Sequence, residues 1–448
     1  MNERLKLKER ISYGLGNLGI CLITTVFSVF AAYFYTNVVG ISILHVGSIM
    51  LIGGIVDAIS DIVMGMVVDK TNTRWGKSRP YLLFMAIPLV VISFLAFNVP
   101  NAPETVKYIY SLITYCLYTC VYTAIFIPYS TLMSSITANL EDRLSVNMWQ
   151  GLGSSIGQFI INSFALSIVA KFGDGINGYR TTILIFGVAA AILLTICFCN
   201  TKERVVPPKG EKIGLNDTLK AFKNSQWLIV CFTVFLALTA VILRAQQTMY
   251  YSQYIMNDID IAPKLLAIST IVAIPVALVM PKLSIKFGKR NMLIAGSVLY
   301  IAASLGMYVF RTNSVIVYAF AFLAGIGGAV PNNVCYVMTA ESIDYGEWKH
   351  GKRVQGALMS FIGFSVKVGA SIGGMLASFI LNLGGYDGAA AVQTQAAKNA
   401  ISMNFIGLPV IMFAIIIVLN LFYTLDKKYP QIKADLELRR SQGEHQTV

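Results

Sequence analysis

The sequence predicts an all-α membrane protein that crosses the bilayer many times. Of its 448 residues, 56% are hydrophobic and only 13% are charged, and the mean hydropathy is +0.66. Soluble domains carry about twice that share of charged residues, so an ordinary soluble enzyme is excluded. The apolar residues also fall in blocks of about 20 or more, which is the length that a helix needs to cross a bilayer. These blocks are continuous rather than alternating, which disfavours a transmembrane β-barrel.

Twelve apolar blocks can be distinguished, and each is expected to form one membrane-spanning helix. The polar connection 201–225 contains Pro207-Pro208 and many charged residues, and it divides the blocks into six plus six. We therefore expect a six-helix bundle at 1–200, a connecting loop at 201–225, a second bundle at 226–424 and a tail at 425–448. The expected spans are 12–37, 44–69, 81–99, 108–136, 146–170, 181–200, 226–256, 264–284, 292–310, 315–341, 354–383 and 401–424.

The distribution of positive charge predicts that both termini lie in the cytoplasm. Lys and Arg are enriched in cytoplasmic loops of membrane proteins. With the N-terminus inside, most of the 35 Lys and Arg residues fall in cytoplasmic segments. The outer loops then hold only Lys107, Lys171, Arg180, Lys264, Arg311 and Lys398. The net charge of +13 then reflects the excess of Lys and Arg in the cytoplasmic segments, and no nucleic-acid partner is implied.

An internal repeat supports two related halves. The loop 74–77 reads Arg-Trp-Gly-Lys, and the loop 286–289 reads Lys-Phe-Gly-Lys at the corresponding place in the second half. The charged connections 141–143 and 344–347 also correspond. Such repeats are typical of transporters of the major facilitator type. Candidate gating residues in these cytoplasmic loops and span ends are Asp69, Arg74, Lys77, Arg79, Arg143, Asp344, Glu347 and Arg353.

Two carboxylates deep in the second expected span suggest a cation site. Ionisable groups at bilayer depth are costly and mark function by default. Asp57 and Asp61 are four residues apart, which places both on one helix face at about 6 Å. Two such carboxylates either take up a proton or share a cation, and oxygen ligands suit Na⁺. The alternative is a pair of structural salt bridges to Lys367 and Arg244.

The two deep basic residues are expected to take part in coupling and in substrate binding. Lys367 is flanked by small residues and would neutralise the aspartates after the cation has left. The fork of Arg244 suits a carboxylate or sugar hydroxyls, and a structural role for it is equally consistent with the sequence.

The sequence lacks the motifs of nucleotide-driven transport and of enzymatic catalysis. No histidine lies deep in a span, which disfavours a histidine proton relay. No nucleotide-binding loop, metal-binding helix or nucleophile elbow is present. The seven cysteines show no metal-ligand spacing. We therefore expect no enzyme and no cofactor, and an ion gradient as the source of energy.

Four stretches of the chain resemble the glycoside–pentoside–hexuronide:cation symporters, the relatives of the melibiose carriers in the major facilitator superfamily. The stretches are YGLGNLG with FYTNVVGIS within 13–43, DAISDIVMGMVVDKTNTRWGKSRPYLL at 57–83, IPYSTLMSSITANLEDR at 127–143, and AESIDYGEWKHGKRVQG at 340–356. The resemblance covers about residues 10–425. It implies the major facilitator fold and symport of a sugar with a cation.

The resemblance implies a cation site formed by Asp57, Ser60, Asp61 and Thr123, with Lys367 beside it. Melibiose carriers have an asparagine where this chain has Ser60. That difference leaves both Na⁺ and H⁺ open as the coupling ion.

The sugar site implied by the resemblance departs more strongly from the melibiose carriers. The family aspartates on helices 1 and 4 and the arginine on helix 5 correspond to Cys21, Phe126 and Gln150, so a melibiose carrier is disfavoured. Rings for stacking and amides for hydrogen bonding indicate the substrate-binding candidates. Together with the arginine described above, these are Tyr122, Trp149, Gln150, Arg244, Gln247, Tyr250, Asn332 and Asn333.

The sequence thus predicts a bacterial inner-membrane transporter that acts as a monomer and imports a glycoside with Na⁺ or H⁺ by alternating access. A lipid or lysolipid transporter on the same fold is the alternative. The loss of the two sugar-type aspartates favours it, whereas the amides of Gln150, Gln247, Asn332 and Asn333 argue against it.

Overall fold

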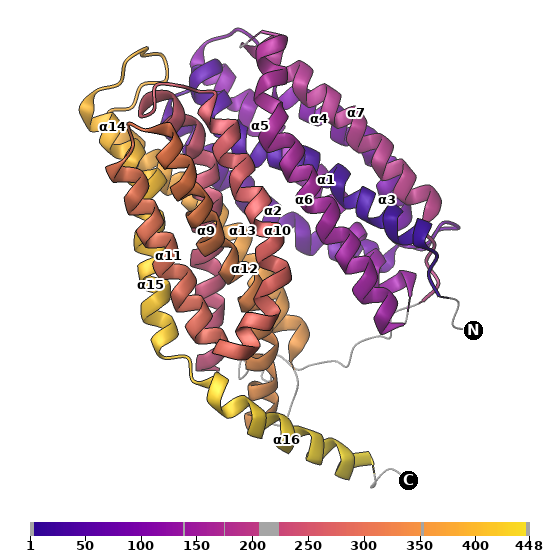
Figure 1. The fold of residues 1–448 in the computed structure, drawn as a ribbon. Helices are drawn as coiled ribbons and strands as arrows, with labels where there is room; N and C mark the ends of the chain where they lie inside the picture. Colours follow the sequence, from indigo (N-terminus) through magenta and orange to yellow (C-terminus); the bar gives the residue numbers. More distant parts are fainter. Residues whose placement is uncertain (1–3, 138, 174, 206–223, 351–353, 445–448) are drawn as a thin grey trace. The chain divides into compact units, whose positions relative to one another are not determined.

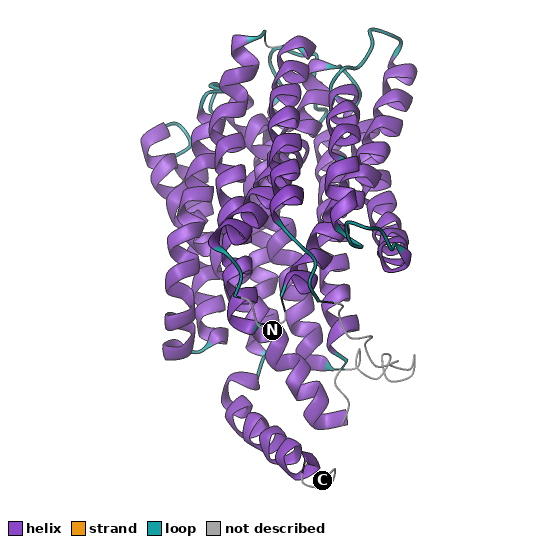
Figure 2. Ribbon diagram, turned by 90° about the vertical axis from the view of Figure 1, so that its right-hand side faces the viewer, coloured by secondary structure: helices purple, strands orange, loops and turns teal. Residues whose placement is uncertain are grey.

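The computed structural model describes residues 4–137, 139–173, 175–205, 224–350 and 354–444. These residues are helical, apart from loops and one isolated bridge between Thr73 and Gly76 (Figures 1 and 2). Within this part of the chain, eleven helices are long and apolar enough to cross a membrane. The predicted all-α, multi-span class is confirmed.

The helices follow one another along the chain with short connections. The first half contains α1 (Leu7–Tyr33), the π-helical turn η1 (Phe34–Val38), α2 (Ile43–Lys70), α3 (Arg79–Phe84), α4 (Ala86–Ala96), α5 (Glu104–Ile136), α6 (Leu140–Lys171) and α7 (Ile176–Asn200). The second half contains α9 (Ser225–Tyr254), α10 (Ile261–Phe287), α11 (Lys289–Val309), α12 (Ser314–His350), α13 (Gln355–Leu383), α14 (Gln395–Ser402), the π-helical turn η2 (Met403–Gly407), α15 (Leu408–Leu421) and α16 (Leu425–Glu444).

The segment expected as the third span is two short helices rather than one. Helix α3 ends at Phe84, and α4 begins at Ala86. Proline at position 88 has no backbone N–H to donate to the carbonyl of Phe84, so the helix is interrupted one turn before it. Helix α4 is therefore shorter than the eleven long apolar helices.

Two compact units can be distinguished, and the first comprises Met1–Lys209, Ala245–Thr270 and Ser371–Phe405. In it α1 runs beside α6 and α7 (Figure 1), and α2 packs on α5. Glycines permit the close approach of α1 and α6. A Cβ at Gly14 would lie 2.6 Å from the carbonyl oxygen of Trp149, and one at Gly153 would lie 2.1 Å from the carbonyl oxygen of Gly14.

A reciprocal tyrosine pair joins α1 and α5. The hydroxyl of Tyr13 donates to the carbonyl of Tyr129 at 3.0 Å, and the hydroxyl of Tyr129 donates to the carbonyl of Tyr13 at 2.8 Å. The rings stack with centroids 4.4 Å apart. Both side chains are fully buried, so the pair fixes this crossing of the two helices.

A cluster of hydroxyl and amide groups connects the end of α1 with α9 and with the loop after α13 inside the first unit. The hydroxyls of Thr36 and Tyr250 are 2.8 Å apart. The amide of Asn37 donates to Tyr254 at 2.7 Å and accepts from Tyr386 at 2.8 Å. Burial raises the pKa of Tyr386, so its hydroxyl stays protonated and remains a donor.

The second unit comprises Gly210–Arg244, Ile271–Ala370 and Ile406–Val448. In it α11 packs against α12 and α15, and α16 packs against α12. Lys289, the first residue of α11, forms ion pairs with Glu341 at 2.8 Å and with Asp426 at 3.8 Å. These contacts join the ends of α11, α12 and α16.

Candidate functional site

The four residues of the predicted cation site come together between α2 and α5. The hydroxyl of Thr123 lies 2.9 Å from Asp57 Oδ1 and 3.1 Å from Asp61 Oδ1. The hydroxyl of Ser60 lies 3.1 Å from that of Thr123 and 2.9 Å from the backbone carbonyl of Asp57. Thr123 is fully buried, whereas Asp57, Ser60 and Asp61 are half-buried on α2.

This arrangement gathers carboxylate, hydroxyl and carbonyl oxygens at one place. The Thr123 hydroxyl has one proton, so it donates to only one of the two carboxylates at a time. Two carboxylates held against one oxygen atom repel each other unless a proton or a cation lies between them. Carboxylate, hydroxyl and carbonyl oxygens are the ligands that hard cations prefer. The geometry therefore suits the binding of a monovalent cation or of a proton.

An aromatic ladder on α5 lies beside this cluster. The rings of Tyr118 and Tyr122 stack at 6.2 Å, and those of Tyr122 and Phe126 stack at 5.4 Å. Phe27 of α1 stacks on Tyr118 at 3.4 Å. Tyr122 lies within electrostatic reach of Asp57. Of these rings, sequence reasoning named only Tyr122 as a binding residue, although the spacing of four residues along α5 indicates a continuous aromatic face.

Two glutamines of the predicted substrate set have buried oxygens without a hydrogen-bond partner in the described part of the chain. These are Oε1 of Gln150 on α6 and Oε1 of Gln247 on α9. Gln247 is only 3% exposed. The position of Gln150 is fixed through its backbone, because its carbonyl accepts a hydrogen bond from the Asn17 amide of α1 at 2.9 Å. A ligand that supplies hydroxyl donors would satisfy both side-chain oxygens. Trp149 is half-buried next to Gln150.

The guanidinium of Arg244 contacts α11 in the second unit. Its Nη1 donates to the hydroxyl of Ser304 at 3.1 Å, its Nη2 lies 2.7 Å from the sulfur of Met307, and its Cζ lies 5.3 Å from the centroid of the Tyr300 ring. Lys367 is half-buried on α13 of the same unit.

The other substrate candidates lie in three different surroundings. Tyr250 is fully buried in the cluster with Thr36 and contacts the rings of Tyr33 and Tyr386 edge-on. The amide of Asn333 donates to the carbonyl of Ala329 on its own helix at 2.9 Å. Asn332 is exposed at the edge of a cavity in the second unit.

The loop between α2 and α3 is held by a glutamate from the chain after α7. The carboxylate of Glu203 accepts from the backbone N–H groups of Lys77 and Ser78 at 2.8 Å and of Arg79 at 3.1 Å. Arg79 also donates to the carbonyl of Phe198 at 2.6 Å. Sequence reasoning missed Glu203, which lies in the expected connecting loop.

The remaining gating candidates lie at the ends of helices. Arg143 donates from Nε to the carbonyl of Thr137 at 2.9 Å, and Arg74 lies over the ring of Trp75 at 4.3 Å. Asp344 accepts from Tyr429 of α16 at 2.8 Å. Asp69 is exposed near the end of α2, and Glu347 is half-buried on α12. Arg353 lies outside the described residues.

Comparison with known proteins finds a family whose model matches nearly the whole chain. The family model described as "MFS/sugar transport protein" matches residues 12–427. The isoprimeverose transporter of Lactiplantibacillus pentosus is 36% identical over 97% of this chain and 92% of the relative. The inner membrane symporter YicJ of Escherichia coli is 32% identical, with 95% and 93% covered. The putative glycoside/cation symporter YagG of Escherichia coli is 30% identical, with 98% and 97% covered.

Solved structures share the same fold at low sequence identity. The crystal structure of a D-xylose–proton symporter superimposes with a TM-score of 0.67 and covers 94% of this chain and 98% of its own, at 13% identity. At this level of identity the match establishes the major facilitator fold alone.

Proposed function

We propose, since this chain belongs to the MFS/sugar transport protein family, that it imports a glycoside together with Na⁺ or H⁺. The family and its relatives are transporters, so the chain is a membrane transporter and not an enzyme. It is a multi-pass protein of the bacterial inner membrane. The observation that carries the proposal is the Thr123 hydroxyl, which lies within 3.1 Å of both Asp57 and Asp61.

The proposed topology has twelve crossings, with α3 and α4 together forming the third. Both termini then lie in the cytoplasm, and the chain works as a monomer in the lipid bilayer. The two functional halves are 1–200 and 226–424, joined by the cytoplasmic connection 201–225 and followed by the tail 425–448. The excess of Lys and Arg in the segments that this topology places inside supports the orientation.

The proposed cation site consists of Asp57, Ser60, Asp61 and Thr123. The cation neutralises the two carboxylates and so stabilises the form of the site that accepts sugar. Lys367 is proposed to replace the cation after its release, which resets the carrier. A gradient then drives accumulation, because one charge moving down 100 mV yields about 2.3 kcal/mol.

The proposed sugar site uses stacking rings and amide oxygens. Tyr122 and Trp149 supply rings, and Gln150 and Gln247 supply acceptors for sugar hydroxyls. Arg244, Tyr250, Asn332 and Asn333 complete the proposed set. The cytoplasmic gate is assigned to Asp69, Arg74, Lys77, Arg79, Arg143, Asp344, Glu347 and Arg353. The names of the relatives support a sugar substrate, and the lipid alternative is not retained.

Transport assays in proteoliposomes test this function and identify the ion. The purified protein is reconstituted, and uptake of a panel of labelled glycosides that includes isoprimeverose is measured under an imposed Na⁺ gradient or an imposed H⁺ gradient. We expect accumulation of at least one glycoside under one of the two gradients. The Asp61→Asn variant should lose accumulation, because one carboxylate no longer holds the cation.

The matched control is Asp260→Asn, which removes a carboxylate from an exposed loop between α9 and α10. It should accumulate sugar like the unmodified protein. Full accumulation by a protein that carries both Asp57→Asn and Asp61→Asn would disprove the cation site.

A further inference from the structure

A tight turn after α2 holds Trp75 at one end of the first unit. The hydroxyl of Thr73 accepts from the backbone N–H of Trp75 at 3.2 Å and donates to the carbonyl of Gly76 at 2.7 Å. The half-buried indole contacts the rings of Phe84, the last residue of α3, and of Phe198 on α7, with centroids 5.8 Å and 6.2 Å away. The turn and these two helices together fix the position of the indole.

Exposed basic residues surround this indole. The guanidinium of Arg74 lies over the Trp75 ring, with Cζ 4.3 Å from the ring centroid, and Arg74 is exposed. Lys77 and Lys202 are exposed as well. Glu203, the neighbour of Lys202, accepts from the backbone N–H of Lys77 at 2.8 Å, so these two lysines lie in segments that touch. Within the part of the chain that the structure describes, none of the three basic residues forms an ion pair.

An exposed apolar surface begins beside the indole and continues along α4 and α7. These helices run side by side (Figure 1), and a Cβ at Gly187 would lie 3.2 Å from Val90 Cγ1. The exposed apolar side chains are those of Phe84 at the end of α3, Ile87 and Val91 on α4, and Val188 and Ile192 on α7. In a multi-pass membrane protein, an apolar patch of this kind contacts the acyl chains of lipids.

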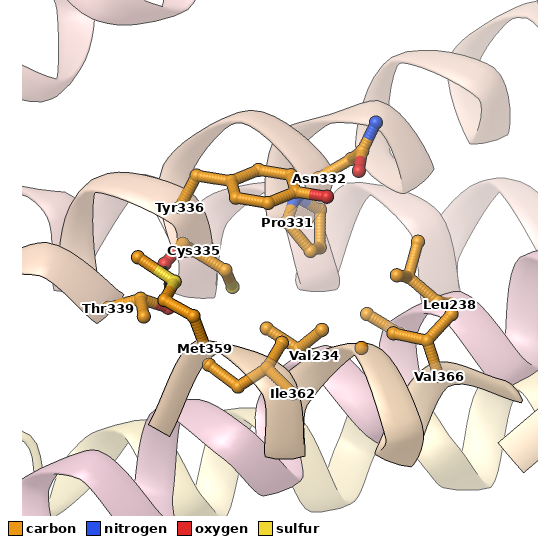
Figure 3. A pocket seen from close by; sticks show the side chains of 12 residues that line it. Val234, Leu238, Pro331, Asn332, Cys335, Tyr336, Thr339, Met359, Ile362 and Val366 are labelled. Atoms are coloured by element: carbon orange, nitrogen blue, oxygen red, sulfur yellow. Dashed lines mark hydrogen bonds between the residues drawn. The ribbon is translucent and has the colours of Figure 1, made fainter. Parts of the chain in front are cut away.

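The combination of basic and apolar residues distinguishes this surface from other apolar parts of the molecule. The cavity between α9, α12 and α13 in the second unit is also mostly apolar (Figure 3), but the described residues that line it include no lysine or arginine. Tryptophan prefers the level of the lipid headgroups, and arginine and lysine bind phosphate oxygens. A tryptophan with exposed basic residues at the end of an apolar surface therefore indicates a lipid with a negatively charged headgroup.

We propose that Arg74, Trp75 and Lys77 form a binding site for the headgroup of an anionic phospholipid, whose acyl chains lie on the exposed apolar side chains of α4 and α7. The phosphate accepts hydrogen bonds from the guanidinium and the ammonium group, and the indole lies beside the glycerol. A soluble phosphate compound would use the basic residues but would gain nothing from the apolar side chains. The inference goes beyond sugar transport. Arg74 and Lys77 also belong to the proposed gate, but lipid binding is measured without transport.

The charge of the headgroup gives the site its selectivity. Phosphatidylcholine also carries a phosphate, but its own ammonium group cancels the charge. Phosphatidylglycerol keeps a net negative charge, which the basic residues attract. We therefore expect the site to prefer phosphatidylglycerol by about fivefold or more, which is the effect of at least one basic residue at a charged lipid surface. High salt should reduce this preference, because exposed charges are screened.

Quenching of Trp75 fluorescence by brominated lipids tests the site. A protein with phenylalanine in place of Trp149, Trp227 and Trp348 emits only from Trp75. It is reconstituted in mixtures of phosphatidylglycerol and phosphatidylcholine in which the acyl chains of one lipid or of the other are brominated. Comparison of the two quenching curves gives the lipid preference next to Trp75. If this variant fails to fold, the difference in emission between the unmodified protein and Trp75→Phe supplies the same signal.

Substitutions of the basic residues identify the headgroup ligands. R74Q should lower the preference for phosphatidylglycerol severalfold, and R74Q with K77Q should lower it to about one. R74K keeps the charge and should keep most of the preference. The matched control is R311Q, which removes an arginine that lies 5.2 Å from the centroid of the Tyr308 ring in the second unit. It should leave the preference unchanged.

Three results would overturn the inference. Equal quenching by the two brominated lipids in the protein with unmodified Arg74 and Lys77 would show that no selective lipid site lies next to Trp75. A preference that persists in the doubly substituted R74Q and K77Q protein would place the headgroup at other residues. Loss of the preference in millimolar glycerol phosphate would show that the site takes a soluble phosphate instead of a lipid.

Discussion

The carboxylate of Glu203 occupies the space in which a side chain at position 76 would have to lie. A Cβ built on Gly76 would be 2.5 Å from Glu203 Oε1, and Gly76 has a φ of +108°. A side chain at position 76 would therefore require the Glu203 carboxylate to shift, and the positive φ would strain the backbone of any residue other than glycine. This contact joins the first repeat motif of the sequence to the start of the connecting segment.

Replacement of Gly76 by alanine should destabilise the protein by at least about 1 kcal/mol. The positive φ is strained for any residue with a Cβ, and the added carbon also displaces the Glu203 carboxylate. The measurement is the thermal unfolding midpoint of the purified protein in detergent. Gly65→Ala on α2 is the control, because its Cβ meets open space. It should leave the midpoint unchanged or raise it. An equal midpoint for both variants would refute this account of the loop.

Replacement of Thr123 by valine should weaken cation binding about tenfold or more. Valine keeps the shape of the side chain but removes a hydroxyl that contacts both Asp57 and Asp61. The measurement is the Na⁺ and pH dependence of glycoside uptake, which gives the apparent affinity for the coupling ion. Thr123→Ser retains the hydroxyl and should stay within a few-fold of the unmodified protein. Similar affinities for the valine and serine variants would show that the hydroxyl is not a ligand.

Replacement of Gln247 by leucine should lower sugar affinity without lowering stability. The buried Oε1 of Gln247 lacks a hydrogen-bond partner in the described residues, so its removal relieves a cost in the empty carrier. When sugar is bound, the same change removes an acceptor. We expect the Michaelis constant for uptake to rise tenfold or more and the unfolding midpoint to stay the same or rise. A lower midpoint with an unchanged Michaelis constant would assign Gln247 a structural role instead.

Replacement of Tyr13 or Tyr129 by phenylalanine should cost about 1 kcal/mol for each hydroxyl lost. Each hydroxyl makes its own bond to the backbone of the other helix, while the stacked rings remain in either variant. The doubly substituted protein should lose nearly the sum of the two effects. Unfolding in denaturant measures both. A double variant no less stable than one single variant would mean that the two bonds do not act independently.

The sequence predicted most of the helices and the common helix face of Asp57 and Asp61 for physical reasons. Apolar blocks of bilayer length leave a chain few alternatives to a helix. The spacing of Asp57 and Asp61 fixes their common face, whatever packs against it. The third expected span is two helices in the structure, because Pro88 has no backbone N–H to continue the helix. The mean hydropathy of a block does not reveal such a break.

Contacts between distant segments could not be predicted from the same patterns. The fork of Arg244 suits a carboxylate or a sugar, and only the folded structure brings it to Ser304 and Met307 of α11. Glu203 lies among many other charges in a polar segment, and nothing local marks it as the partner of the loop at Gly76. The cavity beside Gly363 depends on side chains from three helices, so no single stretch of sequence indicates it.

The half-buried position of Trp149, beside Gln150, also gives the protein a built-in optical probe. The chain has four tryptophans; Trp75 belongs to the loop after α2, Trp227 is fully buried and Trp348 lies near the end of α12. A variant with phenylalanine at those three positions would emit only from Trp149. Its fluorescence would follow the arrival of sugar next to α6 in real time, without a label.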